Sequence, residues 1–171
     1  MLKAYKINEK SKFLIEIEQL MKNQFPKNSQ KSLLPLINSP NGEVLAFFKD
    51  NIFIAFCALI NHKNITHILY LCIIPEYQNQ GHGTKIIEFL KKNKKHIIIA
   101  DVEDSEEKEI KDIETKKRIK RENFYKKNKF INMPFNYKWH KIQYKIFSTE
   151  EISEEEFWKF WEENKGLDKI Y

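Results

Sequence analysis

The chain has 171 residues, a length that usually folds as one domain. Its hydrophobic content of 42% and aromatic content of 13% exclude a disordered chain, and no apolar run reaches the roughly 18 residues of a membrane span. The net charge is +6, yet only Arg118 and Arg121 among the 30 basic residues are arginines. Because nucleic-acid binders favour arginine for bidentate contacts, this composition argues against a nucleic-acid partner.

The two cysteines, Cys57 and Cys72, lie inside apolar runs and predict free thiols in a reducing compartment. The first residues contain no apolar stretch typical of a secretion signal, so we expect a cytoplasmic protein. The sequence has no Cys-x-x-Cys motif or histidine cluster, and we therefore expect no metal site. Both a monomer and a homodimer are compatible with the sequence.

The first third of the chain predicts a short strand followed by helices. Residues 1–7 predict the strand, and residues from 9 onward have apolar side chains at helical spacing up to Pro26, which ends the helix or soon follows its end. The apolar positions of this helix are Phe13, Leu14, Ile17, Leu20 and Met21. Residues 27–41 predict an irregular segment with a short helix near 33–37.

The central part predicts a sheet. Residues 43–48 and 52–60 predict a hairpin around the polar turn Lys49-Asp50-Asn51, and residues 66–74 predict a third strand. Residues 52–60 and 68–74 are almost continuously apolar rather than alternating. Because such strands are covered on both faces, helices are expected on both sides of the sheet.

The second half predicts a helix over 81–94 and a strand over 96–103, and this strand–helix–strand order implies a parallel pair. Residues 104–115 are highly charged, and 116–128 predict a helix with Ile119, Phe124 and Ile113 on its apolar side. Residues 130–133 and 140–147 predict closing strands. Ser153 starts a capping box for a last, Trp/Phe-rich helix over about 153–165, with Gly166 as its C-terminal cap. We expect a single mixed α/β domain with a mostly antiparallel sheet of about six or seven strands.

The loop between the third strand and the following helix contains two of the four glycines. Amides at a helix start have no intrahelical acceptor, and Gly81 and Gly83 would let a phosphate approach them closely. For a lone Gly-x-Gly pair, a turn that simply needs glycine is the commoner explanation. Ile86 excludes a dinucleotide fingerprint, and no earlier glycine fits a P-loop.

The longer pattern of an apolar strand, Pro75, Gln78, Gly81 and Gly83 resembles the signature of GNAT-type N-acetyltransferases. A second resemblance is the run from Phe124-Tyr125 to Phe130, where Lys129 stands at the family's usual glycine and Asn128 is expected to replace it as the left-handed cap. A narrower resemblance, through the acidic strand 100–103 and the doublet 120–121, is to uncharacterised bacterial members. The resemblance covers about residues 1–147, so the last helix falls outside it.

This resemblance implies a GNAT-like fold that uses acetyl-CoA as co-substrate. The amides of the loop would hold the pyrophosphate, and the pantetheine arm would lie along the end of the preceding strand. The implied cofactor-binding residues are Cys72, Ile73, Ile74, Gln78, Asn79, Gln80, Gly81, His82, Gly83 and Thr84. Tyr125 matches the family's general acid, since a phenol is protonated at neutral pH; the alternative is a tyrosine that only packs at a helix end.

A general base is also required. Asp101 and Glu103 stand two residues apart at the end of a strand, so both should point to one face, and partial burial would raise their pKa toward neutrality. The alternative is a solvated strand end. His67 titrates near neutral pH but is expected to lie far from the thioester.

The expected activity is acetyl transfer from acetyl-CoA to a primary amine of a small-molecule or peptide acceptor, by direct attack. Two alternatives remain: a catalytically weak acyl-CoA-binding module, and a protein- or ribosome-associated acetyltransferase. Residues 22–37 and 133–139 are expected to line the acceptor site. The sequence does not define the acceptor.

Overall fold

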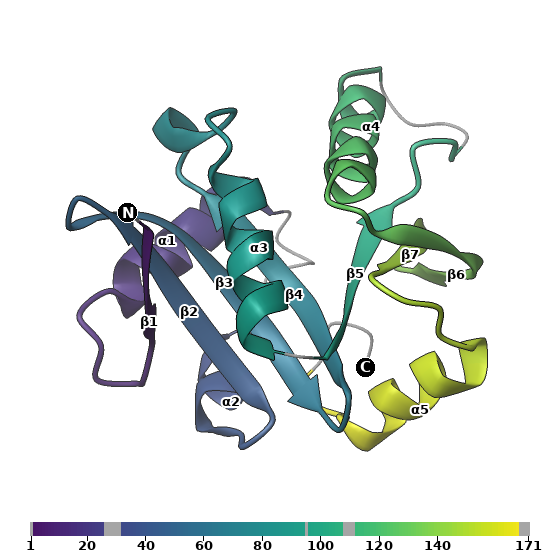
Figure 1. Cartoon of the computed structure of the whole chain (residues 1–171), viewed down its shortest axis with the longest axis horizontal. Helices are drawn as coiled ribbons and strands as arrows, with labels where there is room; N and C mark the ends of the chain where they lie inside the picture. Colours follow the sequence, from purple (N-terminus) through teal and green to yellow (C-terminus); the bar gives the residue numbers. More distant parts are fainter. Residues whose placement is uncertain (1, 26–31, 95, 108–111, 168–171) are drawn as a thin grey trace.

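The computed structural model describes residues 2–25, 32–94, 96–107 and 112–167 (Figure 1). It contains a seven-stranded sheet in the order β1-β2-β3-β4-β5-β7-β6, in which β4 and β5 are parallel and the other neighbours are antiparallel. The expected mixed, mostly antiparallel sheet is therefore confirmed. The strands are β1 (Leu2–Lys6), β2 (Gly42–Lys49), β3 (Ile52–His62), β4 (Ile65–Ile73), β5 (Ile97–Glu103), β6 (Ile131–Trp139) and β7 (Ile142–Ser148).

Helices cover both faces of the sheet, as the continuously apolar strands predict. The helices are α1 (Leu14–Gln24), α2 (Leu34–Asn38), α3 (His82–Lys94), α4 (Asp112–Lys127) and α5 (Glu154–Glu163), with a short 3-10 helix η2 (Pro75–Tyr77). One core cluster joins α1, α2 and α5 to the sheet, and a second joins α3 and α4 to it. Pro26, expected to mark the end of the first helix, lies outside the described residues.

The buried side of α4 differs from the prediction. Ile113 and Ile119, expected to be apolar core positions, are 63% and 44% exposed, whereas Arg118, Glu122 and Tyr125 are buried. The buried side of this helix can carry charges, because an acidic residue after β5 and a lysine on β7 neutralise them. Periodicity of apolar residues therefore gave the wrong face.

The closing hairpin also differs from the prediction. Residues 130–133 and 140–147 were expected as strands, but β6 extends to Trp139, and His140 and Lys141 form the turn, with φ of 45° and 68°. Two consecutive positive φ values give a two-residue hairpin turn whose twist matches that of the strands. An Asn-Gly type of dipeptide usually signals such a turn. Because His140-Lys141 is not such a dipeptide, the sequence did not indicate where β6 ends and β7 begins. The expected turn at Asp50 and Asn51 has the same geometry and is confirmed.

A β-bulge in β4 shapes the middle of the sheet. Ala58 of β3 pairs with Tyr70 and Leu59 pairs with Ile68, so Leu69 is an extra residue without a partner on β3. The parallel pairing of β4 with β5 ends at the same point, with Ile68 opposite Ala100. Because a bulge bends its strand and increases its twist, the two strands diverge beyond it, as Figure 1 shows.

The end of α4 corrects a second expectation. Lys129, not Asn128, adopts the left-handed conformation, with φ of 62°. The amides of Lys129 and Phe130 bond to the carbonyls of Lys126 (2.9 Å) and Tyr125 (3.0 Å), and the rings of Phe130 and Tyr125 lie 5.2 Å apart. These two bonds and the apolar contact form a Schellman motif, which holds Tyr125 in place without a glycine. Asn128 instead bonds through its side chain to the Phe124 carbonyl.

The last helix begins as predicted, with a reciprocal capping box between Ser153 and Glu156. It ends at Asn164, and Gly166 lies two residues beyond that cap with φ of 88°. Gly166 therefore shapes the turn after α5 rather than capping it directly.

Candidate active site

Two residues with positive φ shape the loop between β4 and α3. Asn79 and Gly81 have positive φ values of 59° and 78°, and a side chain at Gly81 would meet no atom within 4 Å. The amide of Lys85 makes a helical bond to the Gly81 carbonyl at 3.2 Å, so the amides of residues 82–84 precede the helical pattern. Glycine at 81 is thus needed for its conformation and leaves open space beside the helix start.

Gly83 is needed for a different reason from the one the sequence suggested. A Cβ atom there would lie 2.8 Å from Cε2 of Phe124 on α4. Glycine therefore lets the start of α3 approach α4, rather than only leaving room for a phosphate. The two signature regions of the sequence, the glycine loop and the Phe124-Tyr125 pair, meet at this contact.

His82 begins α3 and is 5% exposed, and neither ring nitrogen has a hydrogen-bond partner among the described residues. Burial lowers the pKa of its imidazole, and the nearby charges of Lys49 and Lys85 lower it further. The ring therefore stays neutral at physiological pH and packs beside Tyr77, with 6.0 Å between ring centroids.

The end of β4 is tied to the loop and to α1 through one carbonyl. The Ile73 oxygen accepts bonds from the side-chain amides of Gln24 (2.7 Å) and Gln78 (2.9 Å). Gln78 therefore fixes the loop against β4 with its side chain. The contribution of Gln24 was missed, because nothing in the sequence of a helix end indicates a bond across 49 residues.

Tyr125 lies on the buried side of α4 and is 8% exposed. Its ring lies beside Phe130 and stacks on Phe147. Burial raises the pKa of its hydroxyl, the charge of Arg121 opposes this, and the carboxylate of Asp101 raises it again. The phenol is therefore protonated at neutral pH. Tyr125 belongs to the core cluster that also contains Ile68 of β4 and Ala100 of β5, the last residues paired between these strands.

Asp101 is the first residue of β5 beyond its last pair with β4, and its side chain is fully buried. Its oxygens contact His67 Nε2 at 3.0 Å and the Tyr137 hydroxyl at 2.6 Å. Since a carboxylate can only accept, Nε2 carries the imidazole proton. His67 Nδ1 has no hydrogen-bond partner among the described residues. The imidazole ring packs against the Trp161 ring of α5, with 4.6 Å between ring centroids.

This arrangement brings together His67 and Asp101, which the sequence treated as separate candidates. Tyr137, which falls in the predicted acceptor segment 133–139, joins this pair through its bond to Asp101. Helix α5 was missed as a neighbour, because it lies outside the signature.

Glu103 belongs to a different cluster. Its Oε2 lies 3.2 Å from Arg118 Nε and 3.2 Å from Arg121 Nη1 of α4. The two carboxylates expected to act from one face are therefore engaged with different partners. Glu103 is held between guanidinium groups, while Asp101 is enclosed by aromatic side chains.

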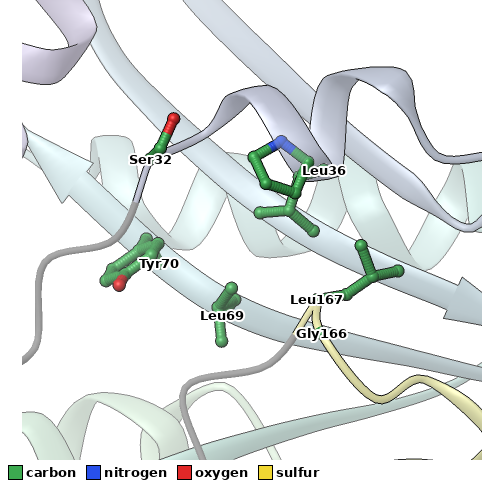
Figure 2. Close-up of a pocket in the computed structure, with 7 residues that line it drawn as sticks. Ser32, Leu36, Leu69, Tyr70, Gly166 and Leu167 are labelled. Atoms are coloured by element: carbon green, nitrogen blue, oxygen red, sulfur yellow. The ribbon is translucent and has the colours of Figure 1, made fainter. Parts of the chain in front are cut away.

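A hollow of about 210 Å³ lies beside the β4 bulge, on the α1, α2 and α5 side of the sheet (Figure 2). Its lining residues are Ser32, Pro35, Leu36, Leu69, Tyr70, Gly166 and Leu167. Part of the expected acceptor segment 22–37 is thus present, although residues 26–31 lie outside the described chain. Residues 133–139 do not line the hollow; Phe135 and Tyr137 pack on Phe157 of α5 instead.

Residues 40–132, more than half of the chain, match the model of the acetyltransferase (GNAT) domain. The chain belongs to the GNAT acetyltransferase family. A GNAT-family protein from Bacteroides thetaiotaomicron has the same fold, with a TM-score of 0.76, 18% identity and 99% of each chain covered. No curated protein matches this GNAT chain.

Two further solved structures share the fold of this GNAT domain. One is a GNAT acetyltransferase from Elizabethkingia anophelis with acetyl-CoA bound, with a TM-score of 0.59 and 16% identity over 88% of this chain and 98% of the other. The other is a Bacillus subtilis acetyltransferase in complex with CoA, with a TM-score of 0.58 and 13% identity over 89% and 100%. Within the described residues of this GNAT domain, no helix has the length and apolar content to cross a membrane.

Proposed function

We propose that the protein transfers the acetyl group of acetyl-CoA to a primary amine by direct attack of the amine on the thioester. The observation that carries this proposal is the end of the β4–β5 pairing at Ile68 and Ala100, with the Gly81 loop after β4 and Tyr125 in the same core cluster as these two residues. The bound acetyl-CoA and CoA of the two similar structures support the choice of co-substrate.

The loop residues Gln78, Asn79, Gln80, Gly81, His82, Gly83 and Thr84 would hold the pyrophosphate through their amides. Residues Cys72, Ile73 and Ile74 would flank the pantetheine arm. Since the Ile73 carbonyl already accepts two side-chain amides, the arm would pair with other backbone groups of this segment. The family membership and the open space at Gly81 favour this assignment.

In the reaction, the amine nitrogen forms a bond to the thioester carbon, the carbon–sulfur bond breaks, and the thiolate of CoA takes a proton. We assign this proton to the Tyr125 hydroxyl. Its raised pKa keeps it protonated at neutral pH. Its place in the core cluster that contains Ile68 and Ala100, where β4 and β5 separate, suits a group that meets the leaving thiolate.

For the base, we propose Asp101 in preference to Glu103. Glu103 pairs with two arginines, and taking up a proton would leave Arg118 with Glu107 alone and remove the carboxylate that faces Arg121. The side chain of Asp101 is enclosed, so it would receive the amine proton through a water molecule rather than by direct contact. His67, hydrogen-bonded to it, would orient the carboxylate.

Tyr125→Phe tests the proposal, because it keeps the ring and removes only the hydroxyl. With CoA release as the measurement, we expect kcat to fall about 10–1,000-fold, the range of a lost general acid or below it. The thermal shift produced by acetyl-CoA should be unchanged, while Gly83→Val should abolish it by forcing α3 away from Phe124. Wild-type turnover in Tyr125→Phe would reduce Tyr125 to a packing residue.

The base is tested with the single variants Asp101→Asn and Glu103→Gln. We expect Asp101→Asn to lower kcat about 100-fold or more and to change the acidic limb of the pH profile. An unchanged acidic limb in Asp101→Asn would remove this residue from the mechanism. Lys129 in place of the family's glycine slightly favours the alternative of a binding module, but the Schellman motif formed at Lys129 weakens that argument.

A further inference from the structure

The hollow beside the β4 bulge has an apolar lining. Leu36, Leu69 and Leu167 face it, together with Pro35 and the ring of Tyr70 (Figure 2). Among the described residues, none that lines it carries a formal charge. A ligand that carries a second charge into this hollow would therefore lose its hydration without gaining a counter-ion.

The bulge itself builds this lining. In a regular strand, consecutive side chains point to opposite faces, so only one of Leu69 and Tyr70 would face α2. The extra residue in β4 places both on the same side of the sheet, in the first core cluster. The hollow thus lies at the residues where β4 leaves β5, next to the strand segment that would flank the pantetheine arm.

We infer that this hollow binds the apolar group of the acceptor, and that the acceptor is a monoamine with an alkyl or arylalkyl chain rather than a polyamine or an amino sugar. This inference rests on the proposed acetyl transfer. The apolar group would occupy the space between α2, the bulge and Leu167, with the amine directed toward the divergence of the strands.

Apolar surroundings also favour the chemistry. Only the neutral amine has a lone pair that can attack a thioester, and desolvation destabilises the ammonium form relative to the neutral one. The hollow therefore selects an apolar chain, and an amine held at its mouth by that chain would be partly desolvated and more often neutral.

The test compares hexylamine with 1,6-diaminohexane, which differ only at the end of the chain that would enter the hollow. For the wild-type protein with acetyl-CoA, kcat/KM from CoA release should be at least 100-fold higher for hexylamine. Shortening to butylamine should lower it by about tenfold or more per methylene lost, the lower end of the range for a hydrophobic pocket. Equal or better use of the diamine would overturn the inference.

The second arm of the test adds a negative charge to the hollow, which should reverse the preference for the monoamine over the diamine. Leu167 is half-buried at the rim, in the turn after α5, so Leu167→Asp adds a carboxylate there with little cost to the core. We expect this variant to lose at least tenfold in kcat/KM for hexylamine and to gain for the diamine. Ile15→Asp is the matched control, since Ile15 is 68% exposed on α1 and does not line the hollow; it should leave both values unchanged.

Amine binding, measured by calorimetry without acetyl-CoA, separates the two proposals. One outcome is that hexylamine binds in calorimetry, more weakly to Leu167→Asp but equally to Ile15→Asp, while no amine is turned over in the CoA-release assay. That result would support the hollow as a binding site and contradict the proposed reaction. Turnover of peptide or polyamine acceptors without turnover or binding of hexylamine would support the reaction and overturn the monoamine assignment.

Discussion

Two halves of this sheet are stabilised by different interactions. In β2, β3 and β4 the buried side chains are almost all apolar, and Phe47, Ile54 and Phe56 have no exposed surface. On the other side of the divergence, α4, β7 and the segment after β5 meet through charges as well as through apolar contacts such as that of Tyr125 with Phe147. Arg118 pairs with Glu107 at 2.5 Å, and Lys145 pairs with Asp104 at 2.9 Å and with Glu122 at 3.2 Å.

The strands β2, β3 and β4 thus form an apolar scaffold, whereas the position of α4 depends on charge pairs. Apolar burial is non-directional and holds the strands that end at the glycine loop. Charge pairs are directional and depend on pH, and they fix α4, the helix that carries Tyr125. We therefore expect the position of Tyr125 to be more sensitive to pH and to single charge changes than the rest of the fold.

The largest effect is expected from the apolar half. Phe56→Ala removes a fully buried ring and should lower the free energy of unfolding by about 3–5 kcal/mol. The loss should be the same at pH 7 and pH 5, because no titrating group is involved. Denaturant unfolding at both pH values measures it, and a strong pH dependence would contradict the apolar account of this half.

In the charged half, Arg118→Met should cost about 3 kcal/mol at pH 7, because Glu103 and Glu107 lose a buried partner. Lys117→Met is the control on the same helix: the Lys117 side chain is 57% exposed and its ion pair with Glu114 should contribute less than about 1 kcal/mol. Similar losses in the two variants would mean that the buried pairs contribute no more than surface ones.

The charged half should also make stability depend on acid pH. Burial alone would raise the pKa of Asp104 and Glu122, but bonds from Lys145 to both, and from Ser105 to Glu122, lower it. Because the unfolded chain then binds protons first, this stability is present above the ordinary carboxyl pKa of about 4 and is lost as pH falls through and below it.

Glu122→Gln should remove about 1–2 kcal/mol at pH 7 and flatten this acid dependence. The measurement is the unfolding free energy between pH 7 and pH 3. An identical slope in the variant and the wild type would show that Glu122 is not responsible for it.

The smallest expected effect lies at the join of the two halves. Lys129 has a positive φ without being glycine, so Lys129→Gly should stabilise the protein by about 0.5–1 kcal/mol. Lys127→Gly, inside the last turn of α4, should destabilise by about 1 kcal/mol. Thermal unfolding of the pair distinguishes a conformational effect from loss of a lysine charge, which both variants share.

The same division explains what the sequence could predict. The strands β2, β3 and β4 and helix α3 were expected within one or two residues, because their apolar runs and turn residues are local signals. The burial of Arg118 and Glu122 could not be expected, since it depends on partners such as Lys145 that approach only in the folded chain. The loop of the site followed from its glycines, whereas the contact of Asp101 with Tyr137 joins residues 36 apart and has no local signal.

The separation of β4 from β5 depends on one extra residue, Leu69, in β4. Deleting Leu69 would restore a regular pairing of β3 with β4, and every residue from Tyr70 would keep its partner and its face. The strand would lose its local bend, and the edge beyond Ile68 would be able to continue its parallel pairing with β5. A single codon would thus decide whether β4 and β5 separate beyond Ile68 or stay paired along their length.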